Sequence, residues 1–397
     1  MTETFKLVSH QPAGDFPLTF LSEPLAQKIR EFHKTFPMYK PTPLAHLKET
    51  AAYLGLGDIH VKNESLRFGL NAFKVLGGSY AIGQYLARKL GKEIENISYD
   101  LLTAPETKAQ LGNITFVTAT DGNHGRGVAW TATQLGQKSV VYMPRGSAAE
   151  RLNNIRAAGA DASIIAGNYD DAVRLANRQA EEKGWVLVQD TAWDGYEDIP
   201  TWIMQGYCTM GLEAYEQLPE KPTHIFLQAG VGSMAGAIAG LFASIYGKDR
   251  PKIIIVEPSK ADCHFRTAQA NDGKLHIVAG DMDTIMAGLA CGEPCSISWK
   301  ILSAYADHFI SFPDYAAAIG MRILGNPVGK DDRIISGESG ASAFGCVAQI
   351  MRDPNLVHIK EALALDCNSR VLFFSTEGDT DKENYKAIVW DGKYANP

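Results

Sequence analysis

The feature that most constrains the fold is a regular alternation of short apolar runs with longer amphipathic segments. Short apolar runs favour strands, and segments of ten or more residues with helical periodicity favour helices. The expected strands are 59–61, 114–119, 139–143, 162–165, 185–188, 223–228, 252–256 and 371–374. The expected helices are 22–36, 79–87, 123–135, 148–158, 169–183, 200–217, 233–246, 313–324 and 339–351. Strands that alternate with helices predict an α/β fold with mostly parallel sheets.

Size and composition restrict the classes of function. The chain has 397 residues, of which 45% are hydrophobic, so it can bury a large core in two domains. Its net charge of −7 and the lack of a basic run disfavour nucleic acid and anionic membranes as partners. The 6 cysteines form no Cys-x-x-Cys pair, so we expect reduced thiols and no metal site. The polar start at 1–17 has no signal-peptide pattern, and we expect a soluble cytoplasmic enzyme.

A lysine lies at one junction between an expected strand and an expected helix. Lys74 follows the apolar run 59–61 and precedes the helical segment 79–87. In α/β folds, ligands bind in the crevice outside the carboxyl ends of the strands. A lysine amine there can form a Schiff base with a carbonyl when burial lowers its pKa. The alternative is a surface lysine whose aliphatic stem packs along the helix.

A glycine-rich turn follows the apolar run 223–228 and opens the next helix. Backbone N–H groups at such a turn converge on an anion at the positive end of the helix. The spacing of Gly230, Gly232 and Gly236, with Glu257 at the end of the next strand, is compatible with a dinucleotide. A single phosphate of a smaller cofactor is also compatible, and so is close packing of helix on strand.

Two further turns carry groups that could meet the edge of an aromatic cofactor. Asn123 lies in an Asp-Gly-Asn-His-Gly turn and could donate to a ring oxygen, or it could simply cap a helix. The hydroxyl groups of Ser375 and Thr376 follow the last expected strand. They could meet a pyridine nitrogen, although a short polar loop would carry the same residues. A ring cofactor with one phosphate would use all three turns, whereas hydride transfer has no evident need for the turn at Asn123.

Taken in order, these segments resemble the fold-type II pyridoxal-phosphate enzymes, the tryptophan-synthase-β and threonine-dehydratase superfamily. The similar segments are 41–44, 71–74, 121–125, 230–236, 283–290 and 338–341. The resemblance implies two open, twisted, mostly parallel sheets flanked by helices, and pyridoxal 5'-phosphate as the cofactor. It also implies a small domain, 89–203, inserted into a large cofactor-binding domain made of 1–88 and 204–397.

One departure narrows the resemblance. Most dehydratases of this superfamily have serine where this chain has Asp121. With segments 189–193, 199–207, 288–294 and 375–380, the chain resembles the diaminopropionate ammonia-lyases. That resemblance implies a carbon–nitrogen lyase of amino-acid degradation that converts D- and L-2,3-diaminopropionate and water to pyruvate and two ammonia. A homodimer is the habit of the family.

The resemblance also implies roles for residues of this chain. Lys74 would carry the cofactor and take the α-proton from one face, and Asp121 would act from the other face. Asp121 and Asp190 would pair with the second ammonium of the substrate, as a serine could not. The alternative for Asp121 is an anion that stabilises a helix N-terminus, and the alternative for Asp190 is a carboxylate in a turn. The expected cofactor-binding residues are Phe73, Lys74, Asn123, Gly230, Val231, Gly232, Ser233, Met234, Ala235, Ser375 and Thr376.

Three other functions remain open on the sequence alone. A serine/threonine dehydratase of the same fold is the nearest, and Asp121 argues against it. A nicotinamide-dependent dehydrogenase would use the turn from Gly230 to Gly236. A non-catalytic carrier would keep Lys74 and the phosphate turn without turnover. The absorbance of the bound cofactor and the rates with diaminopropionate and serine distinguish them.

Overall fold

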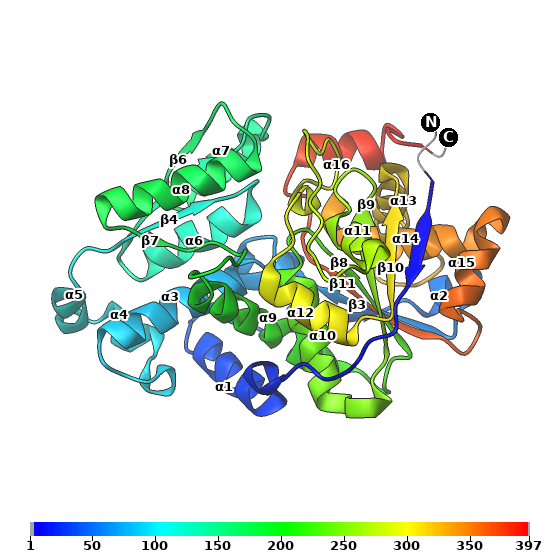
Figure 1. Ribbon diagram of the computed structural model, residues 1–397, viewed down its shortest axis with the longest axis horizontal. Coiled ribbons are helices and arrows are strands. Elements are labelled where there is room, and N and C mark those ends of the chain that lie inside the picture. Colours follow the sequence, from blue (N-terminus) through cyan, green and yellow to red (C-terminus); the bar gives the residue numbers. More distant parts are fainter. Residues whose placement is uncertain (1–3, 396–397) are drawn as a thin grey trace.

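The strands form two separate sheets, one in each lobe of the molecule (Figure 1). The computed structural model describes residues 4–395. The seven-stranded sheet has the order β1-β10-β9-β8-β11-β3-β2, and the four-stranded sheet has the order β6-β5-β4-β7. Within the larger sheet only the edge strands β1 and β2 are antiparallel to their neighbours, and the smaller sheet is parallel throughout. The predicted α/β class with two mostly parallel sheets is confirmed.

The elements follow the predicted alternation closely. The strands are β1 Lys6–Ser9, β2 Leu44–His46, β3 Asp58–Asn63, β4 Thr115–Ala119, β5 Lys138–Met143, β6 Asp161–Ile164, β7 Val186–Leu187, β8 His224–Gln228, β9 Lys252–Pro258, β10 His308–Phe312 and β11 Arg370–Ser375. The α-helices are α1 Glu23–Lys34, α2 Lys48–Leu54, α3 Val75–Lys89, α4 Tyr99–Thr103, α5 Pro105–Leu111, α6 Asn123–Gln134, α7 Ala149–Ala157, α8 Tyr169–Lys183, α9 Asp198–Gln217, α10 Ser233–Tyr246, α11 Cys263–Ala270, α12 Ser296–Tyr305, α13 Asp314–Gly325, α14 Glu338–Arg352, α15 Val357–Leu363 and α16 Lys382–Val389.

The larger sheet is covered by helices on both faces, which explains its continuous apolar strands. In β8, Ile225 and Leu227 belong to the core on one face, whereas Phe226 between them belongs to the core on the other. Side chains alternate between faces along a strand, so a strand buried on both sides is apolar at every position. Helices α3, α9 and α10 contribute to the first core, and α13 and α14 contribute to the second.

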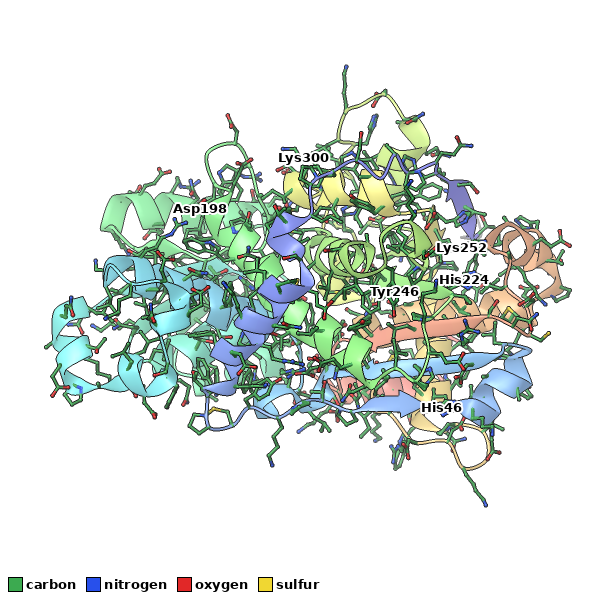
Figure 2. The ribbon with its side chains drawn as sticks, turned by 90° about the horizontal axis from the view of Figure 1, so that it is seen from below. His46, Asp198, His224, Tyr246, Lys252 and Lys300 are labelled. Carbon is green, nitrogen blue, oxygen red and sulfur yellow. The ribbon has the colours of Figure 1, made fainter. Side chains whose placement is uncertain are left out.

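The two lobes meet where α6 of the smaller sheet packs on α3 of the larger one. A side chain at Gly127 of α6 would come within 2.9 Å of the backbone of Val75, so glycine is needed for this approach. Helix α1 crosses beneath both lobes (Figure 2). All four strands of the smaller sheet lie between residues 115 and 187, within the predicted insertion 89–203. The limits of the two domains stay a prediction.

Two regions differ from expectation. The segment 257–313, expected to be irregular, contains α11, α12 and β10, and the polar segment 91–112 contains α4 and α5. Strand β10 is fully buried, but His308 and Ser311 interrupt its apolar run and hide it from a hydropathy pattern. Helices α4 and α5 are too short to show a period, and they begin at the Ser98 cap and at Pro105. Of the helices in residues 4–395, none is long and apolar enough to cross a membrane.

Candidate functional site

A cavity of about 710 Å³ collects the turns that the sequence singled out. The segments that follow β4, β8 and β11 line it, together with Lys74 at the start of α3, so the cavity lies at the carboxyl ends of strands from both sheets. The predicted residues that line it are Phe73, Lys74, Asp121, Asn123, Asp190, Gly230, Val231, Gly232, Ser233, Met234 and Thr376. Ala235 and Ser375 are buried outside its wall.

Backbone pairing holds the Lys74 segment against the last strand. Phe73 N–H donates to the carbonyl of Thr376 at 3.1 Å, and Gly378 N–H donates to the carbonyl of Asn71 at 3.0 Å. Asn71 has a positive φ of 58°, a conformation that asparagine tolerates better than most residues. Lys74 follows at the start of α3. The amine and the hydroxyl of Thr376 are therefore fixed relative to each other by two turns far apart in the sequence.

Asp190 is the partner of Lys74. The Lys74 ammonium and an Asp190 carboxylate oxygen form a direct ion pair, with side chains 19% and 4% exposed. Burial disfavours the ammonium, but the Asp190 carboxylate outweighs burial and raises the pKa of Lys74. The expectation that burial lowers this pKa is wrong for the structure, because a buried carboxylate lies beside the amine. Burial would raise the pKa of Asp190, yet Lys74 and His124 together hold it at about 2.

Asp121 lies across the turn from this pair and is less completely neutralised. Its Oδ2 is 3.4 Å from Nη1 of Arg151, and its side chain is 27% exposed. Burial raises the pKa of Asp121, while Arg151 and Lys74 oppose that shift. A carboxylate with one distant cation can accept or return a proton more readily than Asp190 can. The two carboxylates of the cavity therefore differ in their readiness to change charge.

The N-terminus of α10 faces the cavity and offers donors for an anion. Gly232 precedes the helix with φ of 93°, a conformation that favours glycine. The hydroxyl of Ser233 donates to the carbonyl of Asp190 at 2.6 Å, so the free donors of this turn are backbone N–H groups. Unpaired N–H groups and the helix dipole together favour a phosphate at this position. Ala235 is the third residue of the helix, still in its first turn, and its side chain belongs to the core.

The two hydroxyl groups at the end of β11, on Ser375 and Thr376, have different surroundings. Ser375 donates to the hydroxyl of Ser336 at 2.8 Å and is fully buried. Thr376 lines the cavity and accepts a hydrogen bond from Nε2 of Gln228 at 3.1 Å. Its hydroxyl proton is thereby free to be donated into the cavity, which suits an unprotonated ring nitrogen. Of the two candidates, Thr376 has the geometry for a cofactor contact.

The remaining predicted residues surround the Lys74 amine. The Phe73 ring lies 5.6 Å from Nζ of Lys74 and 4.7 Å from the ring of Tyr207. Asn123 donates from Nδ2 to the Glu377 carboxylate. His124 bonds through Nε2 to the carbonyl of Val188 at 2.8 Å, so its ring is held behind the turn.

The sequence did not single out three charged groups of the cavity. They are Arg151 on α7 and the carboxylates Glu338 and Glu377. Glu338 and Glu377 lie in segments on which the resemblance rests, but neither is among the site residues that the sequence predicts. Arg151 has no local signal, because only the tertiary fold brings α7 beside Asp121. Conversely, Glu257 is bound to the backbone N–H groups of His264 and Phe265, at 2.9 and 2.6 Å, and is not free to bind a ribose.

This arrangement fits the cofactor that the resemblance implies. An amine and a hydroxyl donor stand on one side of the cavity, and a helix N-terminus with a left-handed glycine stands on another. The buried Oε1 of Gln228, beside Thr376, has no hydrogen-bond partner among the described residues. A phosphorylated aromatic aldehyde needs an amine, a hydroxyl donor and a helix N-terminus for its phosphate. A cavity of this volume is within the range for small-molecule sites.

Comparisons with known proteins identify the family. The model of the pyridoxal-phosphate dependent enzymes matches residues 35–359. The diaminopropionate ammonia-lyase of Salmonella typhimurium is 54% identical over 383 residues, which are 95% of each chain. The structure of the Escherichia coli diaminopropionate ammonia-lyase in complex with D-serine has a TM-score of 0.93 at 47% identity, and the match covers 99% of this chain and 98% of that one. The same enzyme in complex with an aminoacrylate-PLP azomethine reaction intermediate has a TM-score of 0.91 at 47% identity, with 99% of both chains covered.

Proposed function

The chain belongs to the pyridoxal-phosphate dependent enzymes, among the diaminopropionate ammonia-lyases, and from this premise we propose how its own residues divide the elimination between them. The reaction takes 2,3-diaminopropionate and water to pyruvate and two ammonia. The observation that carries the proposal is the grouping of one amine, Lys74, with two carboxylates of unequal charge compensation, Asp121 and Asp190, on one cavity.

Lys74 would carry the cofactor covalently through Nζ, and the N–H groups at the start of α10 would hold its phosphate. Thr376 would donate its hydroxyl proton to the ring nitrogen, Asn123 would contact the ring oxygen, and Phe73 would pack beside the ring. Pyridoxal phosphate, when bound, withdraws electrons from the α-carbon of the substrate. A hydroxyl rather than a carboxylate at the ring nitrogen leaves that nitrogen largely unprotonated, which favours elimination with little accumulated charge.

Lys74 and Asp190 form the proton-handling pair on one face. A free Lys74 amine can take the α-proton, and the ammonium that results is stabilised by Asp190 at contact distance. Because the Lys74 ammonium and His124 lower the pKa of Asp190, this carboxylate is charged whenever Lys74 carries its proton. Asp190 therefore acts by keeping a proton on Lys74, which can then be delivered to the departing β-amine. A buried pair is suited to this because the surrounding medium does not screen it.

Asp121 acts on the other face of the bound substrate. Burial raises its pKa, and its only ion pair among the described residues is with Arg151 at 3.4 Å. It can therefore take the α-proton of the D enantiomer, or pair with the second ammonium of either enantiomer. A base on each face gives activity on both D and L substrates, whereas a serine at this position would supply neither a base nor a charge.

The test uses the stopped-flow visible spectrum and pyruvate formation of the purified holoenzyme with D- and then L-diaminopropionate. We expect Asp121→Asn to lower kcat for the D substrate by about 10² to 10³ and to leave the L rate within about threefold. Asp281→Asn, which removes another carboxylate from the same cavity wall, is the matched control and should change neither rate. Equal losses for both enantiomers would instead make Asp121 a substrate anchor.

The same assay addresses the nearest alternative. A serine/threonine dehydratase would eliminate serine faster than diaminopropionate, and such a preference would overturn the assignment of the substrate. The Asp121 carboxylate supports the diamino substrate, because the second ammonium of that substrate is a cation and Asp121 has only the 3.4 Å pair with Arg151 among the described residues. The dehydrogenase alternative loses its support, since Glu257 is bound internally by two backbone N–H groups.

We further propose that the enzyme degrades amino acids in the cytoplasm as a homodimer. The support is the resemblance to the family together with the large apolar side chains Tyr53, Leu66 and Trp390, which are 67%, 61% and 76% exposed on the single chain. Sedimentation velocity of the holoenzyme at two concentrations checks the oligomer. A single species with the mass of one chain would contradict it.

A further inference from the structure

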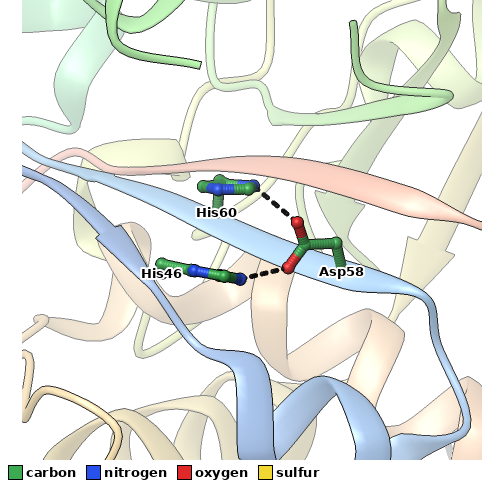
Figure 3. Close-up of side chains that lie close together, drawn as sticks. All are labelled: His46, Asp58 and His60. Carbon is green, nitrogen blue, oxygen red and sulfur yellow. Dashed lines mark hydrogen bonds and ion pairs between the residues drawn. The ribbon is translucent and has the colours of Figure 1, made fainter. Parts of the chain in front are cut away.

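Three metal-ligating side chains gather on one face of the sheet edge, far along β3 from Lys74. His46 on β2 lies directly opposite His60 on β3, and Asp58 is two residues before His60 on the same strand. Residues opposite each other, and residues two apart on one strand, share a face of the sheet. The antiparallel pairing of β2 with β3 therefore brings the three side chains together at the outer edge (Figures 2 and 3).

The carboxylate of Asp58 lies beside the two stacked imidazoles and faces one nitrogen of each. Its Oδ1 is 2.5 Å from Nε2 of His46, and its Oδ2 is 3.7 Å from Nδ1 of His60. The imidazole rings are stacked, with centroids 4.6 Å apart and an angle of 12° between their planes. One nitrogen of each ring thus faces the carboxylate, and one possible ligand atom from each of the three residues lies within 4.8 Å of the other two (Figure 3).

We propose that His46, Asp58 and His60 form a binding site for a divalent transition-metal ion of the zinc class. Two imidazole nitrogens and a carboxylate oxygen are ligands that Zn²⁺ accepts, with water as the fourth ligand. Ligand atoms around a tetrahedral Zn²⁺ are about 3.3 Å apart, so shifts below about 1 Å would admit the ion. The side chain of His46 is 47% exposed, that of Asp58 20% and that of His60 6%, so solvent reaches the site from the His46 side.

The position of the site indicates a structural role for the ion. Two of the three ligands, Asp58 and His60, lie at the amino end of β3, whereas Lys74 follows its carboxyl end. Strand β2 has only three residues and is the edge strand of the larger sheet. An ion shared by His46 and the two β3 ligands would fasten this short strand to the sheet. An ion that binds only the folded state would stabilise it by an amount that grows with the logarithm of the free metal concentration above Kd.

A second group of possible metal ligands consists of Glu257, Cys263 and His264. It differs from the His46 site in its access to solvent and in the hydrogen bonds that its carboxylate already accepts. All three are fully buried. The Glu257 carboxylate already accepts from the backbone N–H groups of His264 and Phe265 and lies 2.9 Å from Nδ1 of His264. A metal there would have to displace bonds that hold the start of α11. At the His46 site an ion would replace the hydrogen bond between His46 and Asp58, while the Ile59 N–H that donates to Asp58 Oδ1 at 3.0 Å can keep its partner.

The proposal is tested by titrating ZnCl₂ into the untagged holoenzyme in an isothermal calorimeter at pH 7.5. We expect the wild type to bind one more equivalent than His46→Asn, or to bind that equivalent at least about tenfold more tightly. His276→Asn is the matched control, because His276 is also an exposed histidine beside an aspartate, Asp272 at 3.1 Å, but it has no third ligand. Identical isotherms for the wild type and His46→Asn would overturn the proposal.

Two further measurements separate this site from other bound zinc. Thermal unfolding with and without Zn²⁺ should raise Tm in the wild type and His276→Asn but not in His46→Asn. The exposed thiol Cys367 lines a neighbouring surface hollow with Asp58 and His60, so Cys367→Ser should keep the affinity of the wild type. A loss of affinity in Cys367→Ser, or a thiolate absorption band with Co²⁺ as the probe, would contradict the ligand set. The diaminopropionate rate at 25 °C should be unchanged by a chelator.

Discussion

Two groups of charged side chains are buried near the segment that carries Lys74, and they differ in whether every charge is paired. The structural cluster consists of Lys62, Glu64, Arg67 and Glu213. The cavity group consists of the cations Lys74 and Arg151 and the carboxylates Asp121, Asp190, Glu338 and Glu377. The first group holds the chain in place, and the second leaves charge available to a ligand.

In the structural cluster every charge has several partners. Glu213 accepts from Arg67 at 2.7 and 2.9 Å, from Lys62 at 2.8 Å and from the hydroxyl of Tyr39 at 2.7 Å. Burial alone would raise the pKa of Glu213, but Arg67 and Lys62 hold it at about 2. The Arg67 side chain is fully buried and also bonds to Glu64 at 2.8 Å. Such a cluster has no free capacity for a ligand.

The cavity group has more carboxylates than cations to balance them. Burial and the neighbouring Glu377 raise the pKa of Glu338 to about 7, and burial also raises the pKa of Asp121. Strongly perturbed groups that face a cavity mark functional sites. The contrast teaches that burial of charge is not itself a signal of function. The two regions differ because the carboxylates of the cavity group have too few cationic partners and face a cavity.

The sharpest test of the contrast is the loss of Lys74. We expect Lys74→Ala to lower kcat by about 10⁴ or more, because no other amine can carry the cofactor. The free energy of unfolding should also fall, by about 3 kcal/mol, because Asp190 is left buried without its cation. Pyruvate formation and urea unfolding measure the two quantities. Lys74→Arg keeps the ion pair but not the nucleophile, and it should be equally inactive. Activity within tenfold of the wild type in Lys74→Arg would contradict the role of Lys74.

The structural cluster should show the opposite pattern. Glu213→Gln leaves Arg67 and Lys62 buried with one carboxylate fewer, and we expect a loss of about 3 to 5 kcal/mol in the free energy of unfolding. The kcat of the folded protein should stay within about threefold. Glu216→Gln, one turn along α9, is the control because Glu216 pairs with Arg30 at the surface and is 45% exposed. If both variants unfold at the same urea concentration, the cluster does not stabilise the fold.

Much of the site follows from local sequence. Lys74, Asn123 and the turn from Gly230 each stand at a strand end, where the parallel α/β fold brings ligand-binding groups together. The alternation predicted every strand of both sheets except β1, β2 and β10. It predicted a longer β7 than the structure has. Edge strands β1 and β2 are short and antiparallel, and their pairing depends on distant segments.

What the sequence did not predict depends on contacts between distant residues. Asp190 was assigned to the substrate, but it lies against Lys74, 116 residues away. Likewise Glu213 pairs with Arg67 across 146 residues. No periodicity or turn motif encodes such pairs, because they form only when the helices pack. The choice between Ser375 and Thr376 also needed the side-chain directions at the end of β11.

A smaller effect is expected in the pH dependence of stability. Between about pH 4.5 and 7 the unfolded chain releases the Glu338 proton that the folded chain keeps, so the free energy of unfolding falls as pH rises. The full effect is about 3 kcal/mol, reached above about pH 7. Glu338→Gln should remove this slope and be more stable than the wild type at pH 8, with little difference at pH 4.5. Urea unfolding at pH 4.5, 6, 7 and 8 measures it.

The control for this prediction is Glu383→Gln on the exposed side of α16. It should leave the slope of the wild type unchanged. A wild-type stability that rises between pH 5 and 7 relative to Glu338→Gln would show that Glu338 is charged in the folded protein. The cavity group would then be fully compensated, like the structural cluster, and the contrast between the two regions would fail.

The smallest expected effect distinguishes two adjacent hydroxyl groups. That of Ser375 is buried away from the cavity, and that of Thr376 faces it. Ser375→Ala removes the 2.8 Å bond to Ser336 and should cost about 1 kcal/mol of stability with kcat within twofold. Thr376→Val keeps the shape but removes the donor that faces the cavity, and kcat should fall about tenfold with a shift of the visible band. Gln228 keeps its 2.9 Å bond to the carbonyl of Phe374, so the wall should not collapse. A spectral shift in Ser375→Ala and none in Thr376→Val would exchange the two roles, because only the hydroxyl that meets the cofactor can alter its spectrum.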